Sequence, residues 1–264
     1  MRPQFANLRK YADFDAAWEP DAYLSDYYRA VENDERATLR FLVEVAAQVG
    51  PIPALLEFGC GPTVHHLFPF AAQAASIHVA DYLPANLLAV RRWMDAVPDS
   101  HDWSPFAASV LGYELGRPAT RSEIVTREEL TRRRIKALLP ADARSSRPLR
   151  DDSARPGYPA VLCCFCPDSI TDDLTEWRRC TRNVASLVAP GGWFVLAALR
   201  AAEAYRVGEA SFPSACVTEH DVADVLEEAG FAPSCTTVTV ATTPDDRDFG
   251  FSSIVLAAGR RSWT

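Results

Sequence analysis

Two kinds of segment alternate along the chain from about residue 52 to the C-terminus. Short apolar runs of strand length are separated by longer stretches whose apolar residues recur at helical spacing. The apolar runs predict strands at residues 54–58, 76–82, 160–166, 193–199, 235–241 and 251–258. The helical spacing predicts helices within residues 20–49 and at 84–96, 127–138, 172–188 and 218–229. Strands that alternate with helices in this way are typical of an α/β fold, in which helices cover both faces of a parallel sheet.

The last two predicted strands are joined by a polar loop without a helix. Strands connected in this way pair antiparallel, because parallel neighbours need a long crossover connection. The helix before them has an N-cap signal at Thr218, followed three residues later by Asp221, and ends at Gly230. The pattern therefore predicts a mostly parallel sheet that ends in an antiparallel hairpin.

No internal repeat and no long Gly/Ser linker divides the chain, so we expect a single domain over residues 1–264. Residues 1–50 would form a helical cap before a core at 51–264, and a basic insertion at about 115–155 would interrupt that core. We interpret the arginines of this insertion as a solvated face, because no aromatic side chains are interleaved with them.

The composition excludes several classes of protein. Of the 264 residues, 48% are hydrophobic and 23% are charged, which suits a buried core and excludes a disordered chain. The 35 acidic and 27 basic residues give a net charge of −8, so nucleic acid is not an expected partner. No apolar stretch approaches the roughly 20 residues that span a bilayer, and no signal peptide is evident, so we expect a cytoplasmic protein without membrane association. The seven cysteines lack the spacing of a zinc site, so we expect reduced thiols and no metal.

Two glycines follow the first predicted strand directly, at Gly59 and Gly61. Glycines at this position allow the backbone to approach a nucleotide closely, although a tight strand-to-helix turn would use the same residues. A dinucleotide fingerprint would need a third glycine at position 64, which is Val64, and this argues against NAD. The second strand ends at Asp81, where a carboxylate can bind both ribose hydroxyls or, alternatively, cap the helix that follows. Adenosine without a pyrophosphate fits both features.

More specific motifs surround this glycine loop. G-x-G-P-T occupies residues 59–63, Asp81-Tyr82 and Asn86 follow, D-W-S-P occupies 102–105, and P-x-x-Y-L-x-x-Y-Y occupies 20–28. With these motifs the chain resembles the family of nicotinamide, phenylethanolamine, indolethylamine and thioether methyltransferases. The resemblance implies a Rossmann-like class I methyltransferase with a seven-stranded sheet and an N-terminal helical cap. It also implies S-adenosyl-L-methionine as the cofactor and S-adenosyl-L-homocysteine as its product.

The resemblance also implies a set of residues around the cofactor. Tyr23 and Tyr28 would form a lid, Asp81 would hold the ribose, and His65 stands where relatives have a tyrosine. A histidine can still donate a hydrogen bond at that position. The complete set is Tyr23, Tyr28, Gly59, Gly61, Thr63, His65, Asp81, Tyr82, Asn86, Asp142, Ala143 and Cys164.

On the acceptor side, the resemblance favours an amine over nicotinamide. Ala198 and Ala202 replace the aspartate and serine of nicotinamide methyltransferase. Acidic residues occur where the phenylethanolamine enzyme has them, and carboxylates select a cationic amine and can accept its proton. The implied substrate-binding residues are Tyr23, Asp168, Tyr205, Glu209, Ser214 and Asp246, with Asp245 as an alternative to Asp246. Of these, Asp168, Glu209 and Tyr205 are the predicted catalytic residues.

Other functions stay open at this point. A methyltransferase of the same fold could act on oxygen, sulfur or carbon, since function resides in the site and not in the fold. The substitutions at His65, Ala198 and Ala202 could also mark a nucleotide-binding module that has lost catalysis. The sequence determines neither the acceptor nor the oligomeric state.

Overall fold

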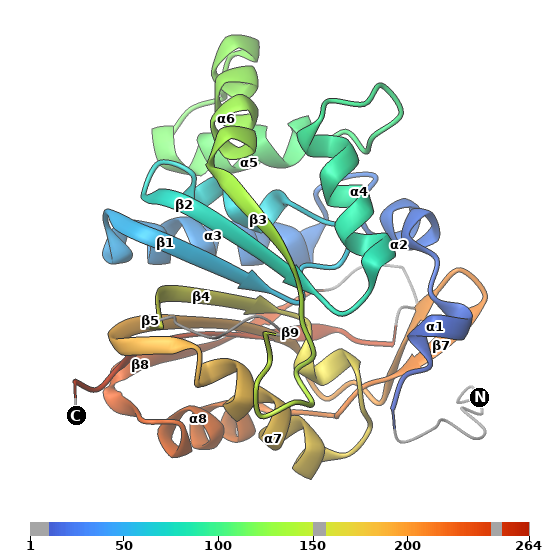
Figure 1. Cartoon of the computed structure of the whole chain (residues 1–264), viewed down its shortest axis with the longest axis vertical. Coiled ribbons are helices and arrows are strands. Elements are labelled where there is room, and N and C mark those ends of the chain that lie inside the picture. The colour runs from blue at the N-terminus through green and yellow to red at the C-terminus, as the bar shows by residue number, and fades with distance from the viewer. Residues whose placement is uncertain (1–10, 150–156, 244–249, 264) are drawn as a thin grey trace.

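A seven-stranded sheet forms the centre of the molecule (Figure 1). The computed structural model describes residues 11–149, 157–243 and 250–263. The strand order is β3-β2-β1-β4-β5-β9-β8, with β9 antiparallel to both of its neighbours and the pairs from β3 to β5 parallel. The strands are β1 Ile52–Phe58, β2 Ala74–Asp81, β3 Ile135–Pro140, β4 Tyr158–Cys164, β5 Val188–Leu199, β8 Phe231–Thr242 and β9 Ser253–Arg261. The predicted parallel sheet with a terminal antiparallel hairpin is confirmed.

Helices cover both faces of this sheet (Figure 1). Helices α3 Asn33–Val49, α4 Pro84–Met94 and α5 Ser104–Leu115 lie on one face, and α7 Leu174–Ala185 and α8 Glu219–Glu228 lie on the other. Successive strand residues point to opposite faces. Accordingly, Leu55 packs in the α3 layer and its neighbour Leu56 packs in the layer that contains Trp177. Because these strands are buried on both faces, their sequences are continuous apolar runs.

The remaining elements lie around the sheet. They are α1 Phe14–Ala17, α2 Pro20–Tyr27, η1 His65–Phe70, α6 Arg121–Arg134, η2 Pro167–Ser169, and the two-stranded sheet of β6 Ala204–Val207 and β7 Ala210–Pro213. Helices α1 and α2 and strand β7 gather at one end of the central sheet (Figure 1). The sequence analysis did not predict α5 or the small β6–β7 sheet.

One predicted helix, at residues 127–138, was wrong in its last four residues. Helix α6 ends at Arg134, and the residues that follow form β3, which pairs with β2 at the edge of the sheet. The helix also begins earlier, because Thr120 and Glu123 form a reciprocal capping box. Strand β3 lies at the edge of the sheet and is only partly buried, so it does not form a continuous apolar run. Its apolar residues continued the spacing of the helix before it, and the sequence therefore gave no separate strand signal. Part of the expected basic insertion is therefore sheet.

Helix α8 begins with the cap that the sequence indicated. The Asp221 backbone N–H donates to Thr218 Oγ1 at 3.3 Å, and the Thr218 N–H donates to Asp221 Oδ2 at 3.0 Å. We expect Thr218→Ala to lower the free energy of unfolding by about 1 kcal/mol, because the first turn loses a side-chain acceptor. Urea denaturation measures this change, with the exposed Ser122→Ala on α6 as the control. An unchanged urea midpoint for Thr218→Ala would show that the cap does not contribute to stability.

Within the described part of the chain, no helix has both the length and the apolar character needed to cross a membrane.

Candidate active site

A cavity lies where five parallel strands end. The last residue of four strands lines it, and so does the residue just after β3: Phe58 of β1, Asp81 of β2, Cys164 of β4, Leu199 of β5, and Ala141. The N-terminal segment covers the opening through residues of α1 and α2. Ligands of open α/β sheets bind at this edge, outside the carboxyl ends of the strands. The position therefore makes the cavity the candidate active site.

The glycine loop between β1 and η1 forms one wall of the cavity. Gly59 and Gly61 have φ angles of +72° and +59°, in the left-handed region that favours glycine. A Cβ on Gly59 would lie 2.2 Å from Cys166 Sγ, so a larger residue does not fit there. A Cβ on Gly61 would meet only Tyr23 Cε1, at 3.8 Å. The loop thus leaves space beside Gly61 for a bound molecule.

The Asp81 carboxylate is held in a fixed orientation beside this loop. Gly61 N–H donates to Oδ2 at 2.8 Å, while Leu83 N–H and Asn86 Nδ2 donate to Oδ1 at 2.8 and 3.0 Å. Burial raises the pKa of Asp81, and these hydrogen bonds oppose that shift. The N-cap of α4 is Leu83, so Asp81 is not the helix cap that the sequence left open. Oδ1 already accepts two hydrogen bonds, whereas Oδ2 accepts one from Gly61 N–H and keeps a lone pair for a further donor such as a ribose hydroxyl.

Aromatic residues within α2 and directly after α1 and α2 line the same cavity as Asp81. The hydroxyl oxygens of Tyr23 and Tyr28 lie 3.1 Å apart, and the Trp18 ring centroid lies 4.7 Å from that of Tyr23. Trp18 Nε1 donates to Asn86 Oδ1 at 2.9 Å. Asn86 therefore connects the aromatic lid to the Asp81 carboxylate.

Almost the whole predicted cofactor set lies on the cavity wall. The wall includes Tyr23, Tyr28, Gly59, Gly61, Thr63, Asp81, Tyr82, Asn86, Asp142, Ala143 and Cys164. His65 is the exception, contrary to expectation, because it is fully buried behind the wall and stacks on Trp103. Its neighbour His66 lines the cavity instead.

The predicted acceptor-side residues are more dispersed. Tyr23 and Tyr205 line the cavity, but Asp168 and Ser214 are buried outside its wall. Glu209 is exposed at the turn between β6 and β7 and is also not part of the wall, so the structure does not bring it to the site. The sixth residue, Asp246, and its alternative Asp245 lie outside the described residues.

Asp168 nevertheless lies directly behind the cavity. Its Oδ2 accepts a hydrogen bond from the N–H of the wall residue Leu199 at 2.9 Å, whereas its buried Oδ1 has no hydrogen-bond partner among the described residues. The next residue, Ser169, lines the cavity and accepts a hydrogen bond from the Tyr205 hydroxyl at 3.2 Å. Burial raises the pKa of the Asp168 carboxyl to about 7, although the Leu199 hydrogen bond lowers it. A carboxyl with such a pKa can exchange a proton near neutral pH.

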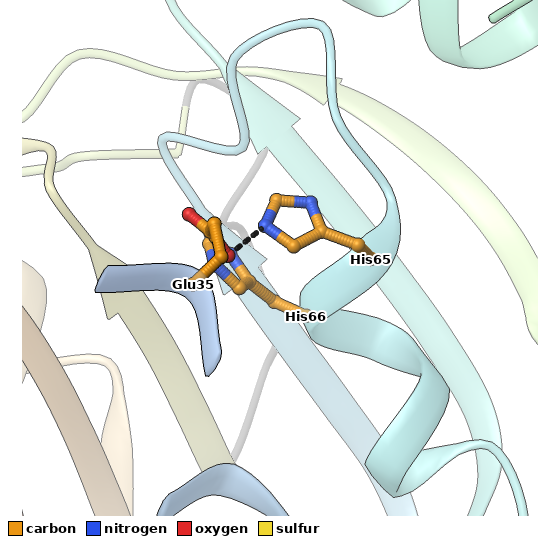
Figure 2. Close-up of side chains that lie close together, drawn as sticks. All are labelled: Glu35, His65 and His66. Carbon is orange, nitrogen blue, oxygen red and sulfur yellow. Dashed lines mark hydrogen bonds and ion pairs between the residues drawn. The ribbon is translucent and has the colours of Figure 1, made fainter. Parts of the chain in front are cut away.

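A buried group of acidic and histidine side chains, which the sequence patterns did not indicate, lies at the same wall (Figure 2). Glu35 Oε2 lies 2.9 Å from His65 Nε2, and His66 Nδ1 lies 3.1 Å from Glu57 Oε1. Burial raises the pKa of Glu35 to about 7 and holds that of His65 well below its usual value. For His66, burial opposes the charged form, but Glu57 and Glu35 outweigh it and raise the pKa. The adjacent histidines were visible in the sequence, but their partner Glu35 is 30 residues away.

The wall residues fit S-adenosylmethionine better than a dinucleotide. The fully buried Val64 occupies the position where a pyrophosphate-binding loop needs glycine. The oriented Asp81 carboxylate could accept a hydrogen bond from a ribose hydroxyl, and the open space beside Gly61 could hold the amino-acid part of the cofactor.

Comparisons with known proteins agree with this geometry. Pig nicotinamide N-methyltransferase is 30% identical over 223 residues, which cover 81% of this chain and 82% of the pig protein. Pig phenylethanolamine N-methyltransferase is 28% identical over 224 residues, covering 81% and 77%. Among solved structures, magnesium protoporphyrin IX methyltransferase from Synechocystis PCC 6803, with bound S-adenosylmethionine, has the same fold with a TM-score of 0.52. It is 15% identical and covers 95% of this chain and 94% of that chain.

A second solved structure with this fold is the N-methyltransferase NodS from Bradyrhizobium japonicum WM9. It has a TM-score of 0.51 at 16% identity and covers 86% of this chain and 96% of that chain. The model of the NNMT/PNMT/TEMT family matches residues 6–248, nearly the whole chain. The fold, the glycine loop with Asp81 and this match together show that the chain belongs to the NNMT/PNMT/TEMT family of S-adenosylmethionine-dependent methyltransferases.

Proposed function

We propose that this enzyme methylates the nitrogen of a small-molecule amine. The observation that carries the proposal is an aromatic wall next to Asp81, with a buried carboxyl directly behind the wall. Trp18, Tyr23, Tyr27 and Tyr205 all line the cavity. Aromatic faces attract a cationic amine, and a desolvated carboxylate strengthens that selection. The curated relatives that act on nicotinamide, phenylethanolamine and indolethylamine support nitrogen as the acceptor atom.

The chain's own residues would act mainly by positioning. S-adenosylmethionine supplies, when bound, a methyl group on a positively charged sulfur. Asp81 and Asn86 would hold the adenosine part, while Tyr23 and Tyr205 would orient the acceptor and exclude water. Alignment of two reactants in this way is worth roughly 7 to 11 kcal/mol at most.

An amine must lose its proton before its nitrogen can attack a methyl group. We propose Asp168 as the proton acceptor, because its pKa near 7 suits proton transfer at neutral pH. The methyl acceptor would reach Asp168 between two wall residues, Leu199 and Ser169. Leu199 donates a hydrogen bond to the Asp168 carboxylate, and Ser169 is the next residue in the chain. Glu209 has no part in the proposal, since its side chain is exposed away from the cavity wall.

An acceptor panel tests the proposed function. Purified protein and S-adenosylmethionine are incubated with aryl-ethylamines, nicotinamide, a catechol and a thiol, and S-adenosylhomocysteine formation is measured for each. We expect turnover of aryl-ethylamines but not of nicotinamide, because the fully buried Ala198 and Ala202 offer no polar side chain to an amide. Turnover of the catechol or the thiol alone would replace the proposal by O- or S-methylation. Cofactor binding without any turnover would favour a module that has lost catalysis.

Other expectations stay predictions of the sequence. They are a single domain, a cytoplasmic location and the lack of a nucleic-acid partner. The oligomeric state is open.

A further inference from the structure

Glu35, His65 and His66 bring three potential metal-ligand atoms together inside the protein (Figure 2). Their ligand atoms all lie within 4.8 Å of one another. Glu35 Oε2 lies 2.9 Å from His65 Nε2 and 4.0 Å from His66 Nε2. The carboxylate comes from α3, and the two histidines are the first residues of η1, directly after the glycine loop. All three side chains are at least nine-tenths buried.

The hydrogen bonds around His66 leave a lone pair that faces this group. His66 Nδ1 bonds the Glu57 carboxylate, so in a neutral ring the proton lies on Nδ1 and Nε2 is an acceptor. His66 Nε2 has no hydrogen-bond partner among the described residues, and the carboxylate oxygen that lies 4.0 Å from it, Glu35 Oε2, is also an acceptor. Leaving a buried polar atom without a partner destabilises the fold. A cation between these two acceptors would give His66 Nε2 a partner and would bind the Glu35 carboxylate oxygen at the same time.

The spacing suits a small transition-metal ion. Zinc binds histidine nitrogen and carboxylate oxygen at about 2.0–2.2 Å, which puts tetrahedral ligand atoms roughly 3.3–3.5 Å apart. The separations of 2.9 and 4.0 Å from Glu35 lie on either side of this value, so small side-chain rotations would equalise them. On binding, the Nε2 proton of His65 would move to Nδ1, which has no hydrogen-bond partner in the described structure, or leave to solvent.

The surroundings resemble those of known metal sites in two respects. Glu57 holds the Nδ1 side of His66, and ligand histidines in proteins are usually oriented by such a carboxylate. Glu35 and His66 also line the active-site cavity. A site with three protein ligands and an open fourth position is typical of catalytic zinc. We propose that Glu35, His65 and His66 bind one divalent transition-metal ion of the zinc class, with its fourth position open to the cavity.

Metal titration of the full chain tests this proposal independently of any methyl acceptor. Chelator-treated protein is titrated with Zn²⁺ by calorimetry and with Co²⁺ by visible absorption. We expect one ion per chain and cobalt bands in the visible without the near-ultraviolet band of a thiolate ligand. That last feature separates the site from the cysteines. Added azide, a small anion that takes open metal positions, should shift the cobalt bands.

Variants locate the ion within the chain. His66→Gln should abolish stoichiometric binding, because a ligand is lost, and Glu57→Gln should weaken it roughly 10- to 100-fold. The exposed His220→Gln on α8 is the matched control and should bind as the parent does. Equal binding by His66→Gln and the parent, a thiolate band, or cobalt bands that azide leaves unchanged would each overturn the proposal. If the variants do not fold, the parent's cobalt spectrum and stoichiometry decide alone.

Discussion

Asp81→Asn is expected to lower the affinity for S-adenosylhomocysteine by about 100-fold or more. A hydrogen bond from a ribose hydroxyl to a carboxylate contributes about 1.5–3 kcal/mol, and an amide nitrogen in the place of Oδ2 cannot accept it. The substitution also disturbs the loop, because an amide nitrogen at Oδ2 would face the Gly61 N–H, another donor. The expected loss therefore combines weaker ribose binding with a displaced glycine loop.

Calorimetric titration of the product measures this effect. The matched control is Asp224→Asn, an exposed aspartate on α8, which should bind as the parent does. Asn86→Ala should give a smaller loss, because the two backbone donors still orient the carboxylate. Far-ultraviolet circular dichroism checks that each variant is folded. Near-parental affinity of folded Asp81→Asn would exclude Asp81 as the ribose ligand.

Asp168→Asn is expected to stabilise the protein above neutral pH. The folded-state pKa of Asp168 is about 7, against an ordinary value of 3.8, so the folded form holds a proton that the unfolded chain loses between these values. Stability therefore falls as pH rises from about 4 to 7, and the full cost is present above that range. Asparagine does not titrate and avoids this cost. Its amide can still accept from Leu199 N–H through its oxygen.

The size of this effect follows from the shift. Between pH 5 and pH 8 the gain from Asp168→Asn should grow by roughly 2–3 kcal/mol, at 1.36 kcal/mol per pKa unit. For a chain of this length that corresponds to roughly 5–10 °C in Tm. The ionisable groups that sense the Asp168 charge are Tyr23, Tyr205, Cys163 and Cys164. Their pKa values are raised by burial, so they stay neutral in this interval and do not obscure the change.

Thermal unfolding at pH 5 and pH 8 tests the stability, and pH–rate profiles of the same variant test the chemistry. A buried carboxyl without a cationic partner lowers the stability of a protein. Such destabilising groups are common at active sites, where activity requires them. We therefore expect Asp168→Asn to gain Tm and lose methylation of amines, whereas Asp224→Asn should change neither. An identical Tm difference at both pH values would contradict the raised pKa. An unchanged pH–rate profile would remove Asp168 from the mechanism.

The sequence predicted most of the fold, and most of the residues it proposed for the cofactor line the cavity. Strands with both faces buried form continuous apolar runs, so β1, β4 and β5 were located within a few residues of their true ends. Gly59, Gly61 and Asp81 were found because they lie just after strands, and parallel strands bring their carboxyl ends to one edge. The half-buried edge strand β3 lacked such a signal, and its first four residues, 135–138, were assigned to a helix.

What the sequence determined by itself was therefore local: the order of strands and helices, the glycine loop and the acid at the end of β2. These features depend on residues that are neighbours in the chain and on the regular spacing of apolar residues, both of which can be observed in the sequence. Only the tertiary structure decided how deeply each side chain is buried and which residues far apart in the chain are in contact. It buried Asp168 behind the wall, left Glu209 exposed, and brought Glu35 on α3 against the histidines of η1. Depth is set by how helices pack on the sheet, and residues far apart in the chain carry no local sign of the partner they will contact.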